Sequence, residues 1–79
     1  MSREDVKITL EAARVMAGYT QAEAARQLGV APSTLASWES NSTKLSYLEA
    51  NRLAKLYGIE PDLLFFGKRN DFIRNIREK

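Results

Sequence analysis

Short hydroxyl side chains recur along residues 32–40, a stretch with the apolar spacing of an α-helix. At about 100° per residue, Ser33, Ser37 and Ser40 fall on one side of this helix, and Leu35 and Trp38 fall on the other. Small hydroxyls let a helix backbone approach another surface closely, and they can donate and accept hydrogen bonds there. The pattern favours contact with base edges in the DNA major groove, and the alternative is close packing against a second helix.

Catalytic and metal-binding chemistry has little support in the sequence. The 79 residues include no His and no Cys, so the commonest general base, thiol nucleophile and zinc ligands are missing. No glycine-rich phosphate-binding loop is present. We therefore expect a protein that is not an enzyme and that has no metal site, cofactor or small-molecule ligand.

The net charge of +2 is unevenly distributed along the chain. Residues 1–67 hold seven Lys and Arg against eight Asp and Glu, whereas residues 68–79 hold five against two. A nucleic-acid-binding domain is expected to carry a concentrated basic patch, so the balance over residues 1–67 favours contact with protein rather than with DNA. The basic excess after residue 67 fits either phosphate contacts or a solvated tail.

No apolar run is long enough to span a bilayer, and residues 1–5 lack the apolar stretch of a signal peptide. Without disulfides or metals, stability must come from an apolar core, for which a hydrophobic fraction of 44% is sufficient. We expect a cytoplasmic protein.

Glycines, prolines and capping residues divide the chain into short helices. Thr9 can cap the first helix, and capping-box patterns at residues 20–23 and 46–49 open the second and fourth. In the second helix, Ala22, Ala25 and Leu28 fall on one face. No segment alternates like a strand, so we expect an all-α fold of five helices plus a short basic C-terminal helix. The expected spans are residues 10–17, 20–28, 32–40, 46–57, 61–66 and 71–78.

The turn at residues 29–31 joins the second and third helices. It consists of Gly29, Val30 and Ala31, and Pro32 then occupies the first turn of the next helix. Two helices joined by a short glycine-containing turn define the helix-turn-helix motif. A helical hairpin that only packs would have the same spacing.

Residues 9–66 resemble the lambda-repressor-like, Xre/Cro-type helix-turn-helix regulators. We expect this domain to span residues 9–67, between an N-terminal arm at 1–8 and a basic tail at 68–79. The segments that carry the resemblance are Tyr19-Thr20-Gln21-Ala22-Glu23, Leu28-Gly29-Val30, Thr34-Leu35-Ala36-Ser37-Trp38-Glu39 and Leu53-Ala54-Lys55-Leu56-Tyr57-Gly58-Ile59.

The resemblance implies roles for individual residues. Gln21 matches the position that anchors a DNA phosphate at a helix N-terminus. Arg14 and Glu39 match a pair of charges that joins the first and third helices. The remaining positions lie near bases (Ser33, Thr34 and Ser37, with Pro32 at the start of the helix) or in the loop that contacts the DNA backbone (Asn41, Thr43 and Lys44).

Two departures from the family pattern affect the third helix. Ala31 stands where such proteins often have a Ser or Thr cap, which weakens the start of the helix by about 1 kcal/mol. No Arg, Gln or Asn precedes Asn41 on this helix, so bidentate base contacts are not available there. Sequence specificity would then depend on Arg26, Asn41 and DNA shape.

We expect a sequence-specific regulator of transcription that binds duplex DNA, is bacterial or phage-encoded, and acts as a repressor. It is either a complete Cro-like protein or the N-terminal part of a longer repressor. We expect a homodimer on pseudo-palindromic sites. The dimer would form through the fifth helix and the tail, since both carry apolar side chains that need to be covered. The alternative is a helix-turn-helix scaffold for protein–protein contact, like an antitoxin or a coactivator.

Overall fold

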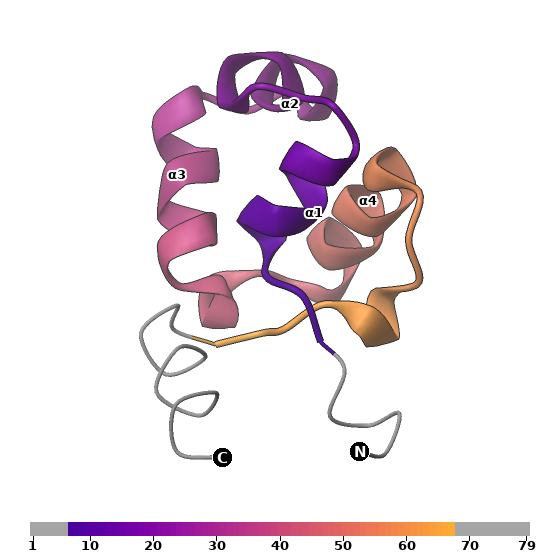
Figure 1. Cartoon of the computed structure of the whole chain (residues 1–79). Helices are drawn as coiled ribbons and strands as arrows, with labels where there is room; N and C mark the ends of the chain where they lie inside the picture. The colour runs from indigo at the N-terminus through magenta and orange to yellow at the C-terminus, as the bar shows by residue number, and fades with distance from the viewer. Residues whose placement is uncertain (1–6, 68–79) are drawn as a thin grey trace.

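The computed structural model describes residues 7–67, and these residues form four α-helices (Figure 1). The helices are α1 (Leu10–Met16), α2 (Gln21–Leu28), α3 (Pro32–Ser40) and α4 (Tyr47–Tyr57). Two short 3-10 turns, η2 (Ser42–Lys44) and η3 (Pro61–Leu63), follow α3 and α4. The described part contains no β-strand, which confirms its all-α character. The expected helix at residues 71–78 lies outside the described residues.

Three of the four helices begin at a side-chain cap that the sequence indicates. The hydroxyl of Thr9 accepts a hydrogen bond from the Ala12 N–H at 3.0 Å at the start of α1. Thr20 and Ser46 each form a complete capping box with the glutamate three residues later. These bonds satisfy N–H groups that a helix leaves unpaired at its first turn, so local sequence sets where the helices start.

The expected fifth helix over residues 61–66 is wrong. Only the turn η3 is helical, and the chain after it is extended. The N–H of Ile8 donates to the carbonyl of Leu63 at 2.8 Å, and the N–H of Phe65 donates to the carbonyl of Ile8 at 2.7 Å. This parallel bridge pairs Ile8 with Leu64. Backbone bonds to a residue distant in sequence thus replace the bonds that a helix would make within itself, and Leu64 becomes buried.

The core lies between the four helices and includes three leucines that are essentially inaccessible to solvent, Leu10, Leu35 and Leu53. Ala24 is also fully buried, and its small side chain lets α2 pack closely against its neighbours. Ala22, which the spacing places with Ala25 and Leu28, is exposed, so that part of the predicted face is wrong. The buried apolar residues are Leu10, Ala13, Ala24, Ala25, Leu28, Leu35, Leu53, Ala54, Tyr57 and Leu64.

Candidate functional site

The turn between α2 and α3 is built by glycine and by a contact from α4. Gly29 adopts a left-handed conformation with φ of 74°, which glycine accepts without steric cost, and it ends α2. The Arg52 guanidinium donates to the carbonyl of Leu28 at 2.7 Å and so supports the same end. The sequence pattern does not reveal this contact, because Arg52 looks like an ordinary solvated residue of α4.

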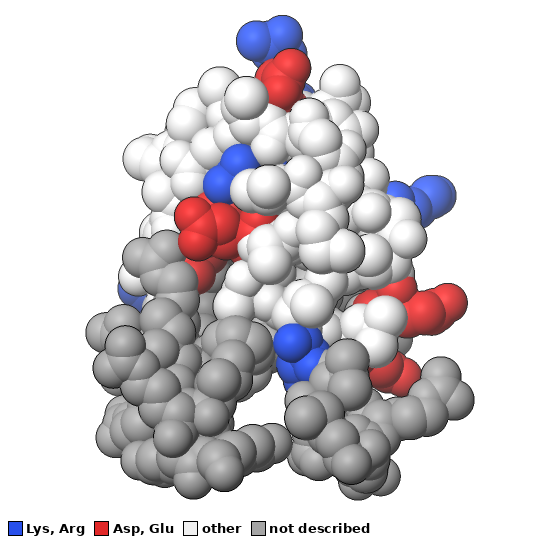
Figure 2. Space-filling model, in the orientation of Figure 1, with Lys and Arg blue, Asp and Glu red and all other residues white. Residues whose placement is uncertain are grey.

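Helix α3 has one buried face and one exposed face. Leu35 is fully buried and Trp38 packs against the core, as the spacing predicts. Ser33, Ser37 and Ser40 are exposed. The single charged residue of α3 is Glu39, and it is buried, so the exposed face of α3 carries no charge. In the view of Figure 2 most of the surface is uncharged, and the Lys, Arg, Asp and Glu side chains form small separate groups on it. Such a face can approach a polyanion without repulsion, and it can make short-range hydrogen bonds.

The start of α2 presents unpaired N–H groups. The box formed by Thr20 and Glu23 uses the N–H groups of those two residues. The backbone N–H groups of Gln21 and Ala22 have no hydrogen-bond acceptor among the described residues. Because the N-terminal end of a helix also carries the positive end of its dipole, this end can bind an anion such as phosphate.

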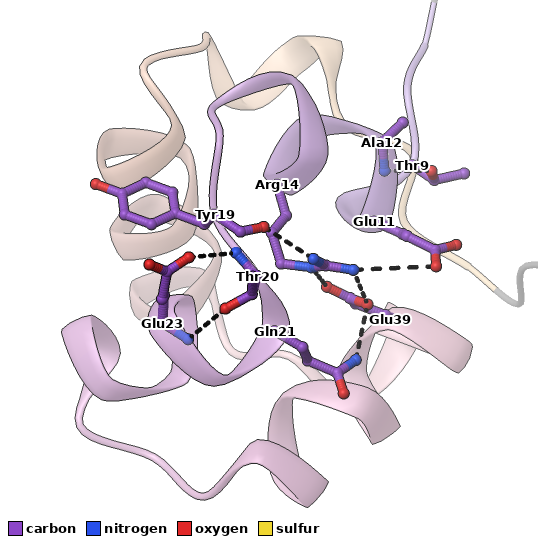
Figure 3. Close-up of polar contacts among 9 residues, drawn as sticks. All are labelled: Thr9, Glu11, Ala12, Arg14, Tyr19, Thr20, Gln21, Glu23 and Glu39. Carbon is purple, nitrogen blue, oxygen red and sulfur yellow. Dashed lines mark hydrogen bonds and ion pairs between the residues drawn. The ribbon is translucent and has the colours of Figure 1, made fainter.

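A buried polar cluster joins α1, α2 and α3 (Figure 3). The Nε of Arg14 lies 2.7 Å from Oε2 of Glu39, and its Nη2 lies 3.5 Å from Oε1. The Nη1 of Arg14 donates to the carbonyl of Tyr19 at 2.9 Å, and Nε2 of Gln21 donates to Oε1 of Glu39 at 3.1 Å. The structure thus brings the predicted charge pair together and adds Gln21 to it, a contact that the sequence pattern does not indicate.

Burial and hydrogen bonding set the ionisation of this cluster. The Arg14 and Glu39 side chains are only 10% and 3% exposed, so each charge depends on the other. The hydrogen bond to Glu39 raises the pKa of Arg14, which stays charged. Nearby, burial raises the pKa of Tyr57 to about 12, and its hydroxyl has no hydrogen-bond partner among the described residues. Arg14 therefore serves two carboxylates, the buried Glu39 at 2.7 Å and the half-exposed Glu11 at 4.0 Å.

The loop after α3 is held in shape by its own side chains. The Asn41 side-chain carbonyl accepts from the Thr43 N–H at 3.1 Å and from the Thr43 hydroxyl at 2.5 Å. Ser42 is buried, and its hydroxyl accepts from the Gly67 N–H at 2.8 Å. Thr43 and Lys44 therefore stay exposed on a rigid loop. Nothing in the sequence indicates the Ser42 anchor, because a serine among other loop serines gives no periodic signal.

The two predicted contact residues of α2, Gln21 and Arg26, do not share one face of this helix. Gln21 reaches the end of α3 through its bond to Glu39. Arg26 is exposed in the last turn of α2, and it lies about 140° around the helix from Gln21. Residues 7–67 hold six basic and six acidic residues, so the described part is electrically balanced. Any phosphate contact on this surface depends on a few precisely held groups rather than on a strong positive field.

No group of three or more acidic residues that could hold a metal ion is found in residues 7–67. No helix in the same range is long and apolar enough to cross a membrane.

A family model described as helix-turn-helix matches residues 10–64, which is more than half of the chain. No curated protein and no solved structure matches the chain significantly.

Proposed function

Because the chain belongs to the lambda-repressor-like helix-turn-helix family of DNA-binding domains, we propose that it regulates transcription at specific duplex-DNA sites, acting as a repressor. The observation that carries the proposal is the exposed, uncharged face of α3 next to the unpaired N–H groups at the start of α2. A helix with short side chains fits the major groove, and a helix N-terminus favours a phosphate.

In this proposal, base contacts and phosphate contacts come from different residues. Ser33, Thr34 and Ser37 face base edges, with Pro32 at the start of the helix. The groups proposed to hold the DNA backbone are Gln21, Arg26, Asn41, Thr43 and Lys44. Phosphate contacts fix the position of the protein, whereas base contacts give the sequence preference.

We further propose that two copies bind pseudo-palindromic sites in the bacterial or phage-infected cytoplasm. The domain would span residues 9–67, with residues 1–8 as an arm and residues 68–79 as a basic tail that helps dimerisation. Exposed apolar side chains support an interface beside the start of α4, where Phe66, 43% exposed, and Tyr47, 86% exposed, line one shallow pocket. Sedimentation of a chain ending at Lys68 should show a shift from dimer to monomer.

Paired titrations of labelled duplexes at two salt concentrations test the DNA-binding proposal. Lys44→Ala should weaken binding to all duplexes alike and reduce the salt slope by about one unit, as expected for one phosphate contact. Lys55→Ala, which removes an exposed charge from α4, is the control and should change neither. Ser37→Ala should instead alter the ranking of site variants, toward the low end of roughly 1–3 kcal/mol.

The charge balance of residues 7–67 favours a second candidate, a protein–protein contact module. A folded protein that binds no duplex at low salt would support this alternative. A site ranking that changes with Lys44→Ala but not with Ser37→Ala would remove α3 as the base-reading element.

A further inference from the structure

The amide of Gln21 is held in one orientation by Glu39. Glu39 Oε1 lies 3.1 Å from Nε2 of Gln21, and the carboxylate is almost completely buried. A carboxylate only accepts hydrogen bonds, so the amide must present its nitrogen to Glu39 and its oxygen away from it. Figure 3 shows this arrangement, with the amide oxygen of Gln21 directed away from Glu39.

One N–H of this amide remains available for another acceptor. The nitrogen has two hydrogens, one of which is used by Glu39, and no other described residue accepts the second. It lies on the first residue of α2, together with the unpaired backbone N–H groups of Gln21 and Ala22. A free glutamine would lose side-chain entropy on being fixed against a phosphate, and here that loss has already occurred on folding.

Arg14 makes this arrangement compatible with a nearby phosphate. An isolated carboxylate behind Gln21 would repel the DNA backbone. The guanidinium of Arg14 lies 2.7 Å from Glu39 and offsets the charge of this buried carboxylate, while the second carboxylate beside Arg14, Glu11, is half-exposed and screened by solvent.

We propose that Glu39 is a positioning residue for DNA binding: it holds the Gln21 amide so that the second N–H meets a backbone phosphate. The inference rests on the proposed function, since it deepens the role of the Gln21 contact. Glu39 acts only through Gln21 and touches no DNA itself.

A mutant cycle on a labelled duplex of arbitrary sequence, measured by fluorescence anisotropy at low salt, tests this coupling. Arg14→Met/Glu39→Met removes the acceptor and keeps the net charge, whereas Arg14→Met/Glu39→Gln keeps an acceptor without a charge. Gln21→Ala should weaken binding about tenfold in the wild type and beside Glu39→Gln, the size of one hydrogen bond to a charged group. In the Arg14→Met/Glu39→Met background, where no acceptor holds the amide, Gln21→Ala should weaken binding less than twofold.

Circular dichroism establishes that each variant is folded. An equal loss from Gln21→Ala in all three backgrounds would overturn the proposal and leave Glu39 a purely structural role. Tighter binding by Arg14→Met/Glu39→Met would also overturn it, because Glu39 would then hold Gln21 away from DNA. If Gln21→Ala has no effect in the wild type, the phosphate contact itself is refuted, and if the folded wild type binds no duplex, the proposed function is refuted.

A measurement on the unmutated protein gives an independent test. The Nε2 protons of Gln21 should give two separate NMR signals in the free protein, one shifted by its bond to Glu39. On addition of duplex, the shifted signal should persist and the other should move. Loss of the Glu39-bonded signal would mean that Gln21 leaves Glu39 to reach DNA, which contradicts the proposal.

Discussion

Helices α2 and α4 differ from α3 in what holds their ends. Each of the first two begins with a complete capping box and ends at a left-handed glycine. Helix α3 begins at Ala31, which makes no side-chain cap, and ends at Asn41 in extended conformation. The ends of α2 and α4 are specified by neighbouring residues, whereas α3 depends on tertiary contacts, chiefly Leu35 and Glu39. The helix proposed to read DNA therefore has weaker local end signals than α2 and α4.

The largest change in the free energy of unfolding should come from removing the buried side chain that packs α3 against the core. Leu35→Ala should lower the free energy of unfolding by about 3–4 kcal/mol, because it leaves a cavity in a fully buried position. Urea denaturation followed by circular dichroism measures this loss. Ser37→Ala, two residues further along the same helix but exposed, should stay within about 0.5 kcal/mol. A loss below about 1 kcal/mol for Leu35→Ala would mean that α3 is held by its local sequence after all.

A tertiary effect should also appear in α4 at high pH. Tyr57 is only 6% exposed, and burial raises its pKa to about 12, whereas an unfolded tyrosine ionises near 10. Between these values the unfolded chain binds fewer protons, so the free energy of unfolding should fall by about 2–3 kcal/mol as pH rises from about 10 to 12. Below about 10 this contribution is fully present. Tyr57→Phe should remove this part of the pH dependence, and an unchanged alkaline profile would contradict it.

Breaking a local cap should cost less. Thr20→Ala removes the hydroxyl that accepts from the Glu23 N–H, and it should lower the free energy of unfolding by about 1 kcal/mol at neutral pH. Hydrogen bonds from Thr20 lower the pKa of Glu23 below its ordinary value of 4.5, so the box is present above that range and is lost as pH falls through the lowered pKa. The difference between wild type and Thr20→Ala should therefore shrink in acid. Ser46→Ala gives the matched measurement on α4.

The smallest expected change is an increase in the free energy of unfolding, obtained by adding the missing cap of α3. The backbone of Ala31 already has the extended conformation of an N-cap, with φ of −70° and ψ of 147°. Ala31→Ser should therefore add about 0.5–1 kcal/mol to the free energy of unfolding without moving α3. Ala22→Ser, at an exposed position inside α2, is the control and should not stabilise the protein. No gain for Ala31→Ser would show that the start of α3 is already fixed by its packing.

These differences explain how much of the fold was predictable. The bounds of α2 and α4 follow from capping boxes and glycines, and Pro32 marks the start of α3; all of these signals act over a few residues. Residues 63–66 are all apolar, a composition that by itself predicts part of a buried helix. In the structure their backbone instead forms hydrogen bonds with the backbone of Ile8, more than 50 residues earlier in the chain. No local pattern contains that information, so the fifth helix was predicted wrongly.

The candidate site also contains residues that the sequence predicts and contacts that only the tertiary structure reveals. The exposed Ser33 and Ser37 follow from helical periodicity, and the ion pair of Arg14 with Glu39 follows from the family resemblance. The third member, Gln21, reaches Glu39 across 18 positions of sequence, and only the packing of α2 on α3 brings the two together. The contact residues themselves remain predictions, and the Lys44 and Ser37 variants test them.

The pairing of Ile8 with the segment after η3 has a kinetic consequence. Its two hydrogen bonds close a loop that contains nearly all of the described domain, so forming them costs the closure entropy of a long loop. Because both bonds involve the backbone of Ile8, they break in the same opening event. The amides of Ile8 and Phe65 should then exchange with deuterium at one common rate, faster than those of Leu35 and Leu53. Separate rates would mean that the two ends of the domain open independently.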